Sequence, residues 1–405
     1  MYKNVFLQKS KITFMKTLAE KFDAKTGNKR ILALDGGGIR GALTLGYLKH
    51  IEELIRKQHS KPDMLLCEYF DMIGGTSTGS IIAAALAKGM SVDEIRDKYF
   101  ELGTKIFGKK YRWYRIFEID DLLKAKYDDK ALISELKNVF GDTLLGDQKE
   151  IKTALVIVAK RADTNSVWPL NNHPKGKFYD TEHGNNKAIP VWECVRASAA
   201  APTYFLPQSI HVGGKDSYAA FVDGGVSMAN NPALQMLMVA TLKGFPYHWE
   251  MGEDKLMVVS VGTGMTRWKK LPRRISKSHL LNWASNLPEM FMQDASWQNQ
   301  QIMQWLSRSP TAVEIDSEVT ALEDDILTDE PGRKKGLIHY LRYNVMLDVE
   351  DLNERFKPSK PYTQKQVDSL AAMDNAKNCR KLYDLGHMAG GQEIKQEHFP
   401  TNFKV

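Results

Sequence analysis

The sequence predicts an α/β protein in which a mostly parallel sheet is crossed by helices and followed by a helical C-terminal elaboration. The first observation is a strand, a glycine turn and a helix that occur twice in succession near the start of the chain. The second is a series of short apolar strands that alternate with helices as far as residue 306. Parallel strands need such crossover helices. The third is a composition of 43% hydrophobic and 26% charged residues over 405 residues, which suits a globular protein with a sizeable core.

The first strand–turn–helix unit follows a polar, helix-prone segment, residues 1–28. Arg30–Leu34 is apolar and short, as expected of a buried strand. Asp35–Gly38 then supplies a glycine turn, and a helix is expected from Arg40 to about Lys57.

The second unit repeats this order. Tyr69–Ile73 is the expected strand, Gly74–Gly79 the turn and Ser80–Lys88 a helix of small residues. The remaining expected elements are strands at Thr153–Ala159, Ala219–Val222 and Leu256–Val261, and helices at Val92–Ile106, Asp120–Val139, Val191–Ser198, Pro232–Leu242, Leu280–Leu306 and Gln364–Leu385.

The chain divides into three regions with no convincing linker between them. Residues 1–28 form an N-terminal helical extension, and residues 29–306 form the α/β domain. Residues 307–405 join an irregular acidic connection to the helical C-terminal elaboration, which we expect to pack on the same domain.

Composition limits the classes of partner and compartment. The chain has 56 Lys+Arg and 49 Asp+Glu, a net charge of +7 that suits an anionic membrane surface or a phosphorylated ligand but is too small to indicate binding to a nucleic acid polymer. A surplus of this size is more often just a solvated surface. The three cysteines, Cys67, Cys194 and Cys379, show no metal or disulfide spacing. With no secretory signal and no apolar run long enough to span a bilayer, we expect a cytoplasmic protein.

The first glycine motif, Gly36-Gly37-Gly38-Ile39-Arg40-Gly41, has the G-x-G-x-x-G pattern of dinucleotide sites. Asp35 argues against a dinucleotide, because its carboxylate would touch the pyrophosphate. Consecutive glycines can instead turn their N–H groups toward a transient oxyanion, just ahead of a helix N-terminus and beside the positive charge of Arg40. A simple tight turn is the remaining alternative.

The second motif, Gly75-Thr76-Ser77-Thr78-Gly79, is a G-x-S-x-G sequence between an apolar strand and a helix of small residues. A serine in this position sits on a sharp turn with its Oγ at the C-terminal edge of the sheet. A serine that only caps the helix is the alternative. The upstream glycine loop favours a nucleophile, whereas a dinucleotide site would leave Ser77 without a role.

A serine nucleophile needs a group that takes its proton. Four histidines follow Ser77 in the chain, but none lies in a marked loop: His211, His339, His387 and His398. Asp223-Gly224-Gly225 follows an apolar run, and glycines behind a carboxylate let it approach a neighbouring loop closely. Asp223 is therefore a candidate base, although such a sequence often forms only a turn.

In combination these motifs resemble the patatin-like phospholipase family. The resemblance is carried by DGGGIRG at Asp35–Gly41, GTSTG at Gly75–Gly79 and DGG at Asp223–Gly225, in that order. Further similar stretches are Arg196–Phe205, Asn230–Pro232, Ser260–Gly264 and, more faintly, Tyr340–Asn344. The similarity is clear from Ile31 to Gly264 and gives least guidance beyond.

The resemblance implies a three-layer α/β/α sandwich, with residues 29–306 as the catalytic domain. It implies hydrolysis of the carboxyl esters of phospholipids through an acyl-enzyme, without a metal or other cofactor. It assigns Ser77 as the nucleophile and Asp223 as its base, a Ser–Asp dyad. It assigns the oxyanion hole to Gly36, Gly37, Gly38 and Arg40, and loop-shaping roles to Gly41, Gly75, Gly79, Gly224 and Gly225.

Two basic stretches interleave lysine and arginine with aromatic residues, Gly108–Phe117 and Thr266–Arg274. The first contains Lys109, Lys110, Arg112, Trp113 and Arg115. This composition is typical of segments that touch a membrane surface, so a transient membrane contact is expected. It also suits the phosphates and base of a nucleotide, or a solvated loop.

The resemblance also bears on regulation. Bacterial members of this compact type include antiphage effectors that cyclic nucleotides switch on and that degrade the cell's own membrane, and the resemblance allows that role here. The competing function is a non-catalytic nucleotide-binding or scaffolding protein with vestigial hydrolase motifs. The intact Ser77, Asp223 and glycine loop argue against that alternative.

Overall fold

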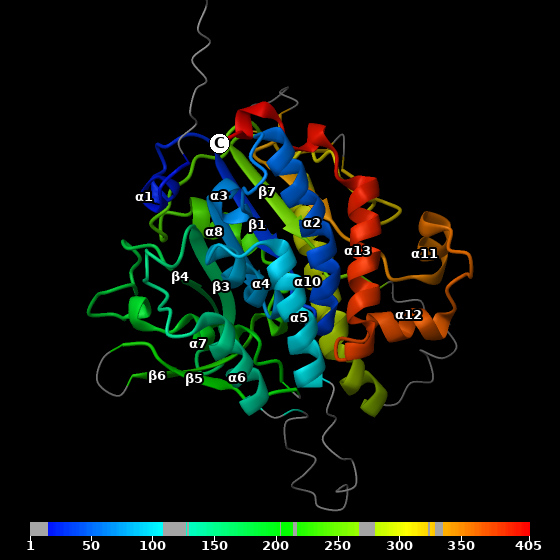
Figure 1. Ribbon diagram of the computed structural model, residues 1–405, viewed down its shortest axis with the longest axis horizontal. Coiled ribbons are helices and arrows are strands. Elements are labelled where there is room, and N and C mark those ends of the chain that lie inside the picture. Colours follow the sequence, from blue (N-terminus) through cyan, green and yellow to red (C-terminus); the bar gives the residue numbers. More distant parts are fainter. Residues whose placement is uncertain are drawn as a thin grey trace, which may run out of the picture.

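A sheet between two helical layers forms the frame of the molecule (Figure 1). The computed structural model describes residues 15–107, 127, 129–202, 204–213, 217–266, 280–322, 325–328 and 335–405. The three-layer α/β/α architecture with a mostly parallel sheet is confirmed.

The strands, in chain order, are β1 Lys29–Leu34, β2 Met72–Thr76, β3 Ala154–Arg161, β4 Ser166–Asn171, β5 Gln208–His211, β6 Tyr218–Asp223, β7 Leu256–Val261 and β8 His339–Tyr343. Their order across the sheet is β5-β6-β3-β2-β1-β7-β8, and β4 pairs with β3 outside this path. The pairs between β3, β2, β1, β7 and β8 are parallel, whereas β4, β5 and β6 pair in antiparallel fashion. Because Leu34 is in register with both Gly75 and Val261, the carboxyl ends of β1, β2 and β7 meet at one edge.

The helices are α1 Leu18–Phe22, α2 Gly41–Gln58, α3 Leu66–Tyr69, α4 Thr78–Ala87, α5 Val92–Phe107, α6 Asp129–Phe140, α7 Val191–Ser198, α8 Ala233–Thr241, α10 Leu280–Trp305, α11 Val349–Phe356, α12 Gln364–Ala371 and α13 Cys379–Glu393. Single 3₁₀ turns lie at η1 Gly38–Arg40, η4 Asn186–Ala188, η5 Gly224–Val226, η6 Ala376–Asn378, η7 Gln396–His398 and η8 Thr401–Phe403. None of the helices in the described ranges is long and apolar enough to cross a bilayer.

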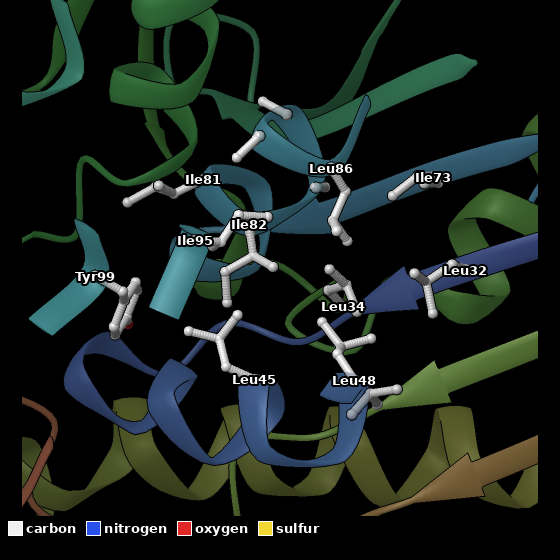
Figure 2. Close-up of a cluster of buried hydrophobic side chains, with 14 of the residues drawn as sticks. Leu32, Leu34, Leu45, Leu48, Ile73, Ile81, Ile82, Leu86, Ile95 and Tyr99 are labelled. Atoms are coloured by element: carbon white, nitrogen blue, oxygen red, sulfur yellow. The ribbon is translucent and has the colours of Figure 1, made fainter. Parts of the chain in front are cut away.

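The central strands are buried on both faces, which explains their continuous apolar sequence. Alternate side chains of β1 enter two separate cores. Leu32 and Leu34 pack in the layer of α2, α4 and α5, where Figure 2 shows them facing Leu45 and Leu48. On the other face, Ile31 joins the core formed with α8 and α10.

Three sequence predictions need correction. The strand expected at Tyr69–Ile73 is shifted, because α3 ends at Tyr69 and β2 starts at Met72. The helix expected over Gln364–Leu385 is broken between α12 and α13. Strands β4 and β5 were not predicted, and the region after residue 306 contributes β8 to the sheet.

Candidate active site

Ser77 lies at the sharp turn between β2 and α4. Its backbone has φ 53° and ψ −126°, a left-handed φ that residues other than glycine seldom adopt. The turn is held because the Ser77 N–H donates to Ser198 Oγ over 2.8 Å, while Ser198 Oγ donates to the Val158 carbonyl over 2.6 Å. A side chain at Gly79 could not fit, since its Cβ would lie 2.2 Å from the Leu34 carbonyl oxygen. The strained serine is thus fixed from three neighbouring segments.

Asp223 ends β6 and faces the serine. The Ser77 hydroxyl forms a hydrogen bond with the Asp223 carboxylate, and the Gly225 N–H donates to Asp223 Oδ1 over 2.7 Å. The Asp223 N–H donates to the Ala200 carbonyl over 3.0 Å, which fixes the end of the strand. The structure therefore brings together the two residues that the sequence singled out on separate strands.

The environment of Asp223 changes its acidity. Burial raises the pKa of Asp223 from 3.8 to about 6, against the opposing effect of the hydrogen bonds from Ser77 and the Gly225 amide. A carboxylate with this pKa is still ionised at neutral pH, and it accepts a proton more readily than an ordinary aspartate. Both properties suit a general base.

The glycine loop after β1 leaves two of the three expected glycine donors available. The Gly36 N–H donates to the Asn230 carbonyl over 3.0 Å, so Gly36 is not available to an oxyanion, and this part of the prediction is corrected. Across the described ranges, no acceptor is found for the N–H of Gly37 or Gly38. Gly38 has φ 57°, and a Cβ there would lie 2.2 Å from the Met373 carbonyl oxygen. Gly37 and Gly38 are therefore the candidate oxyanion donors.

Arg40 lies at the end of η1, beside the glycine loop. Its guanidinium group is largely buried, and Nη1 donates to the Ala371 carbonyl over 3.4 Å. A small cavity lies next to the loop and is lined by Arg40, Asn230, Met292 and Met373, among others. Arg40 therefore adds fixed positive charge at the edge of this cavity.

Helix α10 covers the loop that follows Asp223. The Met292 Cε atom lies 3.6 Å from the position that a Cβ on Gly225 would take. Asn299 Nδ2 donates to the Met228 carbonyl over 2.6 Å and to the Asn231 carbonyl over 3.1 Å. Ser198 and Asn230 lie in stretches that carry the resemblance, but their sequence context predicts no role for either.

The remaining candidates lie elsewhere. Lys109, Lys110, Arg112, Trp113 and Arg115 fall outside the described residues. The histidines considered as bases have other neighbours: His211 contacts Tyr218, His387 stacks on His50, and His339 contacts His398. The candidate base in contact with Ser77 is therefore a carboxylate.

Comparison with known proteins gives a family for the chain. The family model described as "Patatin-like phospholipase" matches residues 32–237. The chain is 28% identical over 253 residues to a cGAMP-activated phospholipase of Escherichia coli (strain TW11681), covering 61% of this chain and 65% of that protein. It is 30% identical over 258 residues to Patatin-17 of Solanum cardiophyllum, covering 58% and 60% respectively.

Among solved structures, the human GIVD cytosolic phospholipase A2 aligns with 93% of this chain and 60% of its own, at 10% identity and a TM-score of 0.41. The chain thus spans less than two thirds of the length of each of these relatives.

Proposed function

Because the chain belongs to the patatin-like phospholipase family, we propose that it is a lipid acyl hydrolase that cleaves carboxyl ester bonds of phospholipids with a Ser77–Asp223 dyad. The observation that carries the proposal is the hydrogen bond between the Ser77 hydroxyl and the buried Asp223 carboxylate. The Gly37 and Gly38 amides provide the third element, a pair of donors for an oxyanion.

The reaction follows from these groups. Asp223 takes the proton of the Ser77 hydroxyl as Oγ attacks the ester carbonyl carbon, and the Gly37 and Gly38 N–H groups receive the developing oxyanion. When the intermediate collapses, the alcohol leaves with the proton held by Asp223, and the acyl group stays on Ser77. Asp223 then takes a proton from a water molecule as the water oxygen attacks the carbonyl carbon of the acyl-enzyme. When this second intermediate collapses, Asp223 returns the proton to Ser77 Oγ and the fatty acid is released.

The direct test is hydrolysis of a panel of phospholipid vesicles by the purified protein. We expect release of free fatty acid and labelling of Ser77 by a fluorophosphonate probe, since such probes react with activated serines. A protein that releases no fatty acid from any lipid and takes up no probe, both without and with cyclic dinucleotides, would instead be the non-catalytic binding or scaffolding protein.

The substrate resides in a membrane, and we propose an apolar rim beside the dyad as the contact surface. The rim consists of Val226, Met228, Leu287 and Phe291, which are 42%, 55%, 38% and 66% exposed. The first two follow Asp223, and the last two lie on α10, which packs against that loop. Exposed apolar side chains around the entrance can enter the acyl-chain region of a leaflet while the polar loops remain in water.

The double variant Met228→Ser/Phe291→Ser should bind uncharged phosphatidylcholine vesicles about tenfold or more weakly. Each substitution removes part of the roughly 1.5–3 kcal/mol of free energy gained when an apolar side chain is buried. Cosedimentation with vesicles measures this effect. Leu242→Ser is the matched control, since Leu242 is 50% exposed but follows the far end of α8. An equal loss of vesicle binding in the control would indicate nonspecific adsorption. Unchanged vesicle binding in the double variant would show that the rim is not the membrane contact.

For regulation, we propose activation by a cyclic dinucleotide and a role as a membrane-degrading effector in bacterial antiphage defence, acting from the cytoplasm at the membrane surface. Support comes from the relative of E. coli, which is named a cGAMP-activated phospholipase. The vesicle assay above, repeated with and without cyclic dinucleotides, tests activation. Equal rates of fatty acid release with and without cyclic dinucleotides would show that the enzyme is constitutively active.

A further inference from the structure

Building on the proposed function, we propose that Arg342 of β8 is a positioning residue that sets the oxyanion loop and the loop after Asp223 in their relative places. Arg342 lies far along the chain from both loops and beyond residue 237, where the match to the family model ends. Its side chain is buried, and its guanidinium group donates to Asp35 and Ser260.

The first of these groups is Asp35, which opens the glycine loop. Arg342 Nη1 donates to Asp35 Oδ1 over 2.9 Å, and Nη2 donates to Oδ2 over 2.6 Å. This parallel pair of charge-assisted bonds fixes the orientation of the carboxylate as well as its position. Asp35 is separated from the donor Gly37 by one residue, so the ion pair defines where the oxyanion donors begin.

The second group leads to the other loop. Arg342 Nη1 also donates to Ser260 Oγ over 2.7 Å, and Ser260 Oγ donates to Asn231 Oδ1 over 3.3 Å. The neighbouring Asn230 accepts the Gly36 N–H, so the two loops are also in direct contact. One guanidinium group is thus bonded directly to the start of the glycine loop and is connected through Ser260 to the loop after Asp223.

Loss of the buried Arg342–Asp35 ion pair should change the rate of hydrolysis by displacing the glycine loop. Arg342 and Asp35 are 6% and 4% exposed, and removal of one buried partner leaves the other without compensation. The loop must then rearrange around Asp35, which moves the Gly37 and Gly38 amides. A displacement of about 1 Å in a catalytic group can lower a rate by about 10²-fold.

The experiment compares kcat and KM of Arg342→Met with those of the wild-type enzyme on a short-chain soluble ester. We expect kcat to fall about 100-fold while KM stays within about twofold, because the oxyanion donors act on the transition state. Arg342→Lys keeps a positive charge but cannot form the two parallel hydrogen bonds to Asp35. Its kcat should therefore be about tenfold higher than that of Arg342→Met. If the methionine variant does not fold, the lysine variant carries the same kcat comparison.

Two further variants separate positioning from stability. Arg30→Met is the matched control, because the Arg30–Asp71 ion pair is equally buried (Nε to Oδ2, 2.8 Å) but lies at the opposite end of β1. It should lower the melting temperature and leave kcat of the folded protein unchanged. The double variant Asp35→Asn/Arg342→Met removes both buried charges, so its melting temperature should recover while kcat stays low.

Unchanged kcat in Arg342→Met would overturn the proposal, and so would recovery of kcat together with stability in the double variant. An equal loss of kcat in Arg30→Met would do the same. If the wild-type enzyme, both without and with cyclic dinucleotides, neither turns over the ester nor takes up the fluorophosphonate probe, the proposed function fails instead.

Discussion

Ser77→Ala is expected to lower ester hydrolysis by more than about 10⁴-fold without loss of the fold. The hydroxyl is the only group removed, and the neighbouring contacts of the turn pass through the Ser77 backbone: its N–H to Ser198 and its carbonyl to Ser80. Fatty acid release and fluorophosphonate labelling measure the loss, and circular dichroism reports the fold.

A second substitution at the same position serves as the control for strain. Ser77→Gly also lacks the hydroxyl, but glycine adopts φ 53° and ψ −126° without a steric penalty. The glycine variant should be equally inactive and more stable than the alanine variant by about 1 kcal/mol in denaturant unfolding. If both variants hydrolysed the ester at a rate near that of the wild type, Ser77 would not be the nucleophile.

Asp223→Asn is expected to lower kcat by about 10³–10⁴-fold and to make the protein more stable at alkaline pH. An amide cannot take the serine proton, which accounts for the loss. The gain in stability follows from the raised pKa, because the folded state binds the Asp223 proton more tightly than the unfolded chain. In the wild-type protein, ionisation of Asp223 lowers the free energy of unfolding as pH rises from 3.8 to about 6, and the loss stays constant above that pH. At pH 8 the free energy of unfolding of Asp223→Asn should therefore exceed that of the wild type by about 3 kcal/mol.

Two measurements check this prediction. In the wild-type enzyme, kcat/KM should fall below pH of about 6, as the buried carboxylate becomes protonated. Urea unfolding at pH 4 and pH 8 should give a larger stability advantage for Asp223→Asn at the higher pH. A variant with near-normal turnover would show that another group takes the proton.

The sequence predicted the central elements because their hydrophobic patterns are strong. β7 and α7 were predicted with their observed bounds, since β7 is buried throughout and α7 carries an apolar face. β2 was shifted because Gly74 and Gly75 looked like a turn. They belong to the strand, where a Cβ on Gly74 would lie 2.5 Å from the Val156 carbonyl oxygen, so close packing rather than chain reversal requires glycine.

Other elements depend on tertiary contacts that no local pattern contains. β4 includes Pro169, which is uncommon in strands and is tolerated here because β4 lies off the main path of the sheet. The break between α12 and α13 places the Met373 carbonyl where it accepts the Ile39 N–H over 2.7 Å. Its cause is thus a contact with the glycine loop far away in sequence.

The candidate site shows the same division. Ser77 and Asp223 could be singled out because each has a motif around it. The motif could not tell which glycine amides are free, since that depends on the Asn230 carbonyl binding Gly36. Arg342 lies in Tyr340–Asn344, the faintest of the similar stretches, and nothing in that stretch pointed to a role for the arginine.

The position of β8 at the end of the sheet has a consequence during synthesis. β8 joins the sheet beside β7, which pairs with β1 from the opposite end of the chain. Pairing between such distant segments cannot occur until both have left the ribosome. During synthesis, Ser77 therefore leaves the ribosome early, whereas the sheet is completed only after β8 has been made. We expect nascent chains to show no esterase activity before β8 has joined the sheet.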